Sequence, residues 1–202
     1  MAQQLVYTGF ITVDGVVDSP GSTSEGHRGG GWVFETEFDA DSYSLKAEEL
    51  EETTGLVFGR RSYEAFSAVW PESDDHAAYR DLPKYVVSTT MEENSIVDGW
   101  GPTTILRSSD DVARLKHGGE GALFIHGSAE LARRLGEEGL IDRYNLLMFP
   151  YLLSGGKSIF GRGDRERRNL RLLDSAAYGN GVVKLVYEAV DSERNRDSVE
   201  SE

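Results

Sequence analysis

Two adjacent arginines stand where a short apolar segment gives way to an amphipathic one. Arg60 and Arg61 follow Gly59 and precede Ser62. A helix start carries partial positive charge, so two cations there are unfavourable unless a negative group binds nearby. Guanidinium groups grip phosphates in bidentate fashion, and the free N–H groups of a helix start also attract anions. The Gly59–Ser62 stretch therefore indicates a phosphorylated ligand; the alternative is a solvated pair of surface arginines.

Small and hydroxyl residues also follow two other predicted strands. One group is Ser88, Thr89 and Thr90, and the other runs over residues 127–130. The carboxyl ends of parallel strands line one crevice, and glycine there lets a pyrophosphate approach the backbone. Together the three junctions suit a dinucleotide, although Ser128 could be only a helix cap and the threonines only a strand end. No G-x-G-x-x-G motif follows the first strand, which disfavours the ordinary Rossmann arrangement.

The elements that must position these junctions alternate between strands and helices. We expect strands at 4–15, 55–59, 84–89, 103–108, 121–127 and 142–153, and helices at 39–54, 61–70, 109–117 and 128–139. Ser109 and Ser128 are the predicted N-caps of the last two helices. Residues 169–190 are typical of a hairpin that turns near 179–181. This order predicts an α/β fold, with a mostly parallel central sheet, helices on both faces and an antiparallel C-terminal hairpin.

Composition bounds the class of protein. The 202 residues suit a single domain over 1–190, followed by a disordered acidic tail at 191–202. The net charge of −14 argues against non-specific nucleic-acid binding. The chain has no cysteine and no metal-binding spacing among its histidines, so we expect no metal site. It also has no membrane-length apolar stretch and no signal-peptide pattern, so we expect no membrane partner and a cytoplasmic location.

Several motifs occur in the order typical of a known family. They are "TVDG" at 12–15, "GLVFGRRSYEAF" at 55–66, "YVVSTT" at 85–90, "HGSAELARRL" at 126–135 and "GGKSIF" at 155–160. Over residues 4–190 the chain resembles the dihydrofolate reductase-like fold family, and within it the RibD C-terminal reductase group in its standalone form without a deaminase domain. Authentic dihydrofolate reductase is disfavoured because the C-terminal half resembles the RibD group.

The resemblance implies an enzyme that uses NADPH to transfer a hydride to a small heterocyclic, pteridine- or pyrimidine-like substrate, in riboflavin- or folate-related chemistry. It also implies a set of cofactor-binding positions at the ends of the strands. The predicted cofactor-binding residues are Asp14, Gly59, Arg60, Arg61, Ser62, Ser88, Thr89, Thr90, Arg107, Ile125, His126, Gly127, Ser128, Ala129 and Glu130. The two arginines would favour NADPH over NADH. His126 replaces a glycine of the family pattern and could equally be a buried histidine.

The resemblance identifies the proton-donating carboxylate and the substrate-binding residues less specifically than the cofactor-binding residues. Acidic residues at 35, 37, 39 and 41 crowd the region of the family's carboxylate, and Asp39 is the predicted catalytic residue, with helix capping as its alternative. Trp32 and Phe34 are the predicted substrate-binding residues, because aromatics in a glycine-rich loop suit stacking on a flat ring. Core packing is the alternative for both.

Two further expectations concern class and assembly. A folded relic that binds a nucleotide for regulation, without catalysis, is the alternative to the reductase. The apolar run at 146–153 and the terminal hairpin offer more apolar strand than one sheet needs, and the resemblance implies dimers through C-terminal strands. We therefore expect a homodimer.

Overall fold

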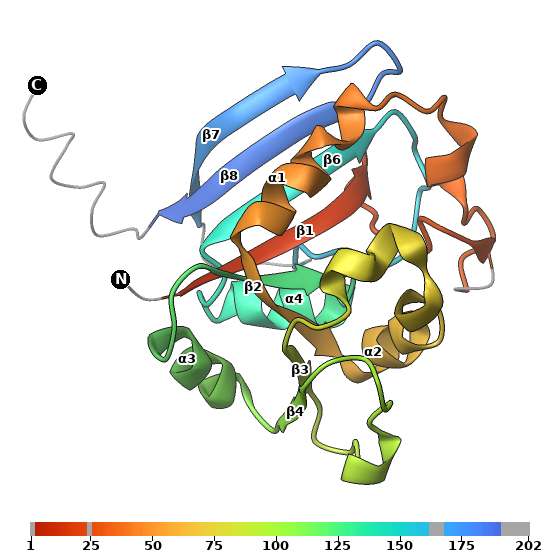
Figure 1. Ribbon diagram of the computed structural model, residues 1–202. Coiled ribbons are helices and arrows are strands. Elements are labelled where there is room, and N and C mark those ends of the chain that lie inside the picture. Colours follow the sequence, from red (N-terminus) through yellow and green to blue (C-terminus); the bar gives the residue numbers. More distant parts are fainter. Residues whose placement is uncertain (1–2, 24–25, 162–167, 191–202) are drawn as a thin grey trace, which may run out of the picture.

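The structure is a computed structural model that describes residues 3–23, 26–161 and 168–190. Its centre is an eight-stranded sheet in the order β4-β3-β2-β5-β1-β6-β8-β7 (Figure 1). The predicted tail at 191–202 lies outside the described residues.

The strands and helices follow the predicted order along the chain. The strands are β1 (Gln4–Thr12), β2 (Thr53–Gly59), β3 (Lys84–Val87), β4 (Thr103–Leu106), β5 (Ala122–His126), β6 (Arg143–Phe149), β7 (Asn169–Ala177) and β8 (Val183–Val190). The α-helices are α1 (Ser44–Glu52), α2 (Arg60–Ser67), α3 (Ser109–His117) and α4 (Ala129–Glu137). Short 3-10 turns include η2 (Trp32–Glu35), η3 (Asp41–Tyr43), η4 (Trp70–Glu72) and η5 (Asp74–Tyr79).

Six of the strands form a parallel sheet, as the alternation of elements predicts. β1 pairs in parallel with both β5 and β6, while β2 pairs with β3 and β5, and β3 with β4. The hairpin β7–β8 adds two antiparallel strands beside β6. Parallel strands send their carboxyl ends to one edge, so β1, β2, β3 and β5 all deliver their loops to the same side of the molecule.

Helices cover both faces of this sheet, as predicted. Alternate residues of β1 and β5 point to opposite sides, with Leu5 and Ile125 packing with the α3 and α4 side chains. Val6 and Phe124 pack on the other side with α2 and η5. Helix α1 lies on that second side and crosses in front of β1 and β6 (Figure 1).

Several element boundaries differ from the sequence prediction, and the following differences have an identifiable local cause. The helix predicted over 39–54 is only α1, because a 3-10 turn precedes Ser44 and Thr53 already begins β2. Ser108, not Ser109, caps α3, in a capping box with Asp111. The strand predicted over 142–153 ends at Phe149, immediately before a proline, whose missing N–H ends pairing. The strand predicted over 4–15 ends at Thr12, where a turn begins.

Candidate functional site

Two of the three predicted junctions are joined directly by hydrogen bonds. The Gly59 N–H donates to Ser128 Oγ at 2.7 Å, and the Ser128 N–H donates to Ser62 Oγ at 2.9 Å. The starts of α2 and α4 therefore lie side by side, although they are far apart in the sequence. Ser128 corrects one prediction: its side chain caps no N–H of α4, because the hydroxyl serves Gly59 instead.

The turn between β5 and α4 depends on an unusual backbone. Gly127 and Ser128 have φ values of +64° and +53°, so two successive residues are left-handed. A Cβ on Gly127 would lie 3.3 Å from the ring of Phe66, and glycine avoids both the strain and this contact. The sharp turn brings the free N–H groups of the α4 start beside those of α2, which is an arrangement suited to anions.

The two arginines at the start of α2 are both exposed, but they differ in their contacts. Arg60 donates to Thr90 Oγ1 at 3.1 Å, and this bond links α2 to the turn after β3. Arg60 also forms an ion pair with Glu64 of the same helix, at 3.1 Å. Arg61 has no hydrogen bond or ion pair with any residue that the structure describes. Arg61 is therefore the cation of this junction that is available to a ligand.

The third junction is a turn after β3, and an arginine braces it. Ser88 Oγ accepts the N–H groups of Thr90 and Met91, at 3.2 and 3.0 Å. Arg107 Nη1 donates to the backbone oxygens of Ser88 and Met91, at 3.0 and 2.7 Å. Thr89 and Thr90 remain exposed at the tip. The structure thus gives Arg107 a bracing role, and its contact with a cofactor stays a prediction.

The last two residues of β5 point to opposite faces. Ile125 is fully buried in the core beneath α4. The His126 ring lies 5.5 Å from the rings of both Trp70 and Tyr79, and its Nε2 is buried with no partner among the described residues. Burial, with the nearby charges of Lys46 and His76, lowers the pKa of His126 to about 3. The imidazole is therefore neutral at physiological pH.

The two predicted aspartates hold backbone segments in place. Asp14 accepts the N–H of Ser154 at 2.7 Å and the hydroxyl of Thr12 at 2.5 Å, and these bonds keep its pKa below the usual value. It thereby joins the turn after β1 to the loop after β6. Asp39 accepts the Asp41 N–H at 3.0 Å at the start of η3. The catalytic role of Asp39 stays a prediction, and its observed contact is a local bond within the turn that leads into η3, whose N-cap is Ala40.

The two predicted substrate-wall aromatics lie in different environments. Trp32 is 1% exposed, and its ring packs edge-on against that of Phe149, with 5.3 Å between the ring centroids. Its Nε1–H donates to the backbone oxygen of Asp18 at 3.0 Å. Phe34 is 79% exposed. Trp32 thus belongs to the core beside the loop, whereas Phe34 is the ring that a ligand could reach.

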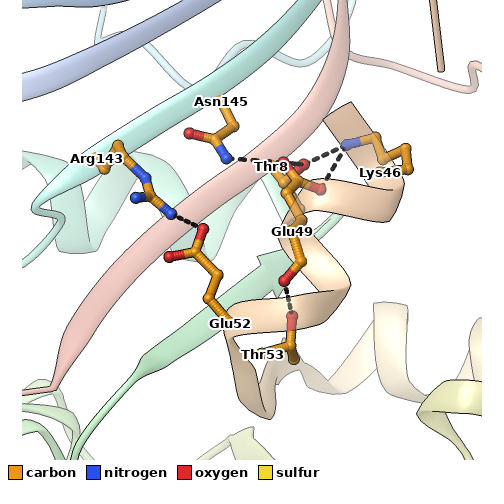
Figure 2. A network of polar contacts seen from close by, with 7 residues as sticks. All are labelled: Thr8, Lys46, Glu49, Glu52, Thr53, Arg143 and Asn145. Atoms are coloured by element: carbon orange, nitrogen blue, oxygen red, sulfur yellow. Dashed lines mark hydrogen bonds and ion pairs between the residues drawn. The ribbon is translucent and has the colours of Figure 1, made fainter. Parts of the chain in front are cut away.

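A polar cluster on the α1 face was missed from the sequence. Glu49 is 1% exposed, and its Oε1 accepts the hydroxyl of Thr8 at 2.6 Å and the Asn145 amide at 2.9 Å (Figure 2). Lys46 contacts both Thr8 and Glu49. The available signal was helical spacing: Glu49 lies four residues after Leu45 and so shares the buried face of α1.

Two other kinds of site are absent from the described ranges. No group of three or more His, Cys, Asp or Glu side chains is placed to hold a metal ion there. Within the same residues, no helix has the length and apolar character to cross a membrane.

Sequence comparison with known proteins identifies a family match over most of the chain. The family described as the RibD C-terminal domain matches residues 3–184. Among curated proteins, the Bacillus subtilis (strain 168) protein YyaP is 26% identical over 145 residues, covering 68% of this chain and 75% of YyaP.

Solved structures share the fold at low sequence identity. A protein of Shewanella sp. PV-4 that is named for riboflavin biosynthesis has a TM-score of 0.73 at 21% identity, covering 95% of this chain and all of its own. Dihydrofolate reductase of Enterococcus faecalis, complexed with NADP(H), has a TM-score of 0.59 at 13% identity, covering 95% and 100%. RibD of Acinetobacter baumannii has a TM-score of 0.62 at 11% identity, covering 94% of this chain and 58% of RibD.

Proposed function

The chain belongs to the family of the RibD C-terminal domain, and on that premise we propose that it is an NADPH-dependent reductase of a small pteridine- or pyrimidine-like heterocycle. The observation that carries the proposal is the contact between the start of α2 and the start of α4, which are bonded to each other. The side chain of Arg61 lies at this contact and has no partner among the described residues. Helix starts and a free guanidinium are the groups that bind a phosphorylated cofactor.

Each part of the cofactor has a candidate partner. The backbone N–H groups at the starts of α2 and α4 that are not already bonded to Ser128 and Ser62 would bind the pyrophosphate, while Arg61 and the hydroxyls of Thr89 and Thr90 would bind the 2′-phosphate of the adenine ribose. NADPH, when bound, supplies the hydride. The end of β5 would then lie beside the nicotinamide, with neutral His126 directed to the face that α1 covers. Asp39 is the proposed proton donor, and Phe34 the proposed ring contact. An enzyme that consumes NADPH also fits the cytoplasmic location that the sequence predicts.

A turnover screen tests the activity. Purified protein is mixed with NADPH and a panel of oxidised pteridines and pyrimidines, and the loss of NADPH absorbance is followed. We expect turnover with at least one ring, and we expect Gly127→Val to abolish it, because valine at a φ of +64° disrupts the junction. NADPH binding without any turnover would favour the regulatory relic, and absence of NADPH binding would refute the proposal.

We also propose that the protein is a homodimer through its terminal hairpin. Among the described residues, β7 is an edge strand that pairs with β8 alone, and it exposes Leu170, Leu172 and Leu173 at 41%, 50% and 49%. A long edge strand with exposed leucines is a surface that proteins normally cover. Light scattering at tens of micromolar protein should give the dimer mass, and Leu172→Lys should shift it to the monomer. A monomeric wild type would refute the assembly and leave the activity untouched.

A further inference from the structure

Three polar side chains form a row across the middle of the sheet. Thr8 on β1 stands opposite His126 on β5 and opposite Asn145 on β6 in the parallel registers. Paired residues in a sheet project to the same face, and this is the face that α1 covers. The row begins one residue before Gly127, so it lies directly beside the junction proposed to bind the cofactor.

Helix α1 places an ion pair over this row (Figure 2). The Glu49 carboxylate is buried, and it is already engaged by Thr8, Asn145 and Lys46. The Lys46 side chain is 24% exposed, and its Nζ also lies 5.5 Å from the ring centroid of Phe10. The carboxylate is therefore committed inside the protein, and Lys46 is the more exposed member of the pair.

The hydrogen-bond capacity of Lys46 is not exhausted. An ammonium has three donors. Two of them are directed at Thr8 Oγ1 and at Glu49 Oε2, and no backbone oxygen or other side chain among the described residues accepts the third. The two protein contacts fix the position of Nζ, so the remaining donor has a defined place at the edge of the row.

Two further polar atoms of the row lack partners within the described chain. Asn145 Oδ1 and His126 Nε2 are both buried and make no hydrogen bond there. Asn145 as a whole is 2% exposed. Buried polar groups without partners are costly, so the polar row on either side of Thr8 is incompletely satisfied by the described protein groups.

We propose that Lys46 is a substrate-binding residue that selects a ring presenting a hydrogen-bond acceptor edge, and that Glu49 and Thr8 are the residues that position it. The inference rests on the proposed function, because the ring concerned is the substrate of the reductase. A positive donor favours carbonyl oxygens and repels ring edges made of amino groups. The protein therefore discriminates between rings of the same shape by the polarity of one edge.

Binding of two matched rings tests this selection. The full chain is saturated with NADP⁺, which permits no reduction, and titrated with 2,4-dioxopteridine and with 2,4-diaminopteridine. These probes share one bicyclic frame and differ in acceptor against donor groups. We expect the wild type to bind the dioxo ring at least about tenfold more tightly, the effect of one charge-assisted hydrogen bond.

Variants assign the preference to the ion pair. Lys46→Met should reduce the ratio of the two affinities to within about twofold, while Lys46→Arg, which keeps the cation, should retain most of it. Glu49→Gln should lower the ratio of the affinities for the dioxo and diamino rings and leave the NADPH affinity unchanged. A general destabilisation of the fold would change both quantities. Lys116→Met is the matched control, because Lys116 is also paired with a carboxylate, that of Asp142, but extends from α3 on the opposite face. Its ratio should equal that of the wild type.

The outcomes separate this inference from the proposed function. A wild type that binds NADPH but prefers the diamino ring, shows no preference or binds neither ring overturns the role of Lys46 and leaves the cofactor site standing. Retention of the full ratio in a folded Lys46→Met variant overturns it as well. Failure of the wild type to bind NADPH refutes the proposed function itself.

Discussion

The junction between α2 and α4 and the cluster beneath α1 are both polar, but they are built in opposite ways. The junction is made of backbone N–H groups, two hydroxyls and exposed arginines at the ends of strands. The cluster is made of side chains from the middles of β1, β6 and α1, with a buried carboxylate at its centre. At the junction, the side chains of Arg60 and Arg61 face solvent, whereas the polar side chains of the cluster bond mainly to one another.

This difference predicts where each region affects the protein. An exposed cation or hydroxyl at the junction contributes little to folding but can contact a charged ligand strongly. A buried, hydrogen-bonded carboxylate contributes to folding, because its removal leaves its partners without acceptors. Substitutions at the junction should therefore change cofactor affinity more than stability, and substitutions in the cluster should change stability.

The largest expected effect is at Glu49. Glu49→Ala should lower the free energy of unfolding by about 3 kcal/mol, because it strands two buried donors and the Lys46 ammonium. Chemical denaturation measures this change. Glu51→Ala, an exposed glutamate of the same helix, is the control and should stay within about 0.5 kcal/mol of the wild type. Equal effects of the two substitutions would mean that the cluster contributes no more than a surface residue.

The second effect is a pH dependence from His126. Its folded-state pKa of about 3 lies below the unfolded value, so the unfolded chain binds one more proton between the two. The free energy of unfolding should therefore fall as the pH is lowered, by about 2 kcal/mol between pH 6.5 and 5 as an upper estimate. His126→Phe, which suits the surrounding aromatic rings, should remove that part of the slope. An unchanged slope in the variant would contradict the assignment.

The third effect should appear mainly in binding. Ser62→Ala removes the acceptor of the Ser128 N–H and should cost about 1 kcal/mol of stability. The loss of alignment between the two helix starts should weaken NADPH binding by about tenfold, a larger change in free energy than the change in stability. Calorimetry and denaturation measure the two quantities, with Ser67→Ala of the same helix as the control. A drop in stability with unaltered NADPH affinity would remove the distinction between the regions.

The sequence predicts the junction well because its determinants are local. A glycine or a serine that follows an apolar strand and precedes apolar residues at helical spacing marks the end of the strand. This signal does not depend on which strands lie beside it in the sheet. Parallel pairing then brings the ends of β2 and β5 to one edge, and the hydrogen bonds of Ser128 and Ser62 confirm that they meet. The order of elements and the antiparallel hairpin follow from the same local patterns.

The cluster could not be predicted in the same way, because its partners are far apart in the chain. Glu49 contacts Thr8 and Asn145 across 41 and 96 residues, so the pattern of no single segment shows that the three side chains meet. Local competition also explains the boundary errors. Ser108 and Ser109 both precede acidic residues, and only the formed capping box with Asp111 distinguishes them. Asp39 bonds to the backbone of Asp41 in the turn that leads into a 3-10 helix, and α1 begins five residues later than its acidic start suggested.

The central claim is that the free cation at the junction binds the 2′-phosphate of NADPH. Calorimetric titration of the wild type with NADPH and with NADH tests it most directly, with Arg61→Ala as the variant and Arg114→Ala, an exposed arginine of α3, as the control. We predict that NADPH binds about ten- to a hundredfold more tightly than NADH, that Arg61→Ala narrows this gap by about tenfold, and that Arg114→Ala leaves it intact. Equal affinities of the wild type for the two cofactors would contradict the account.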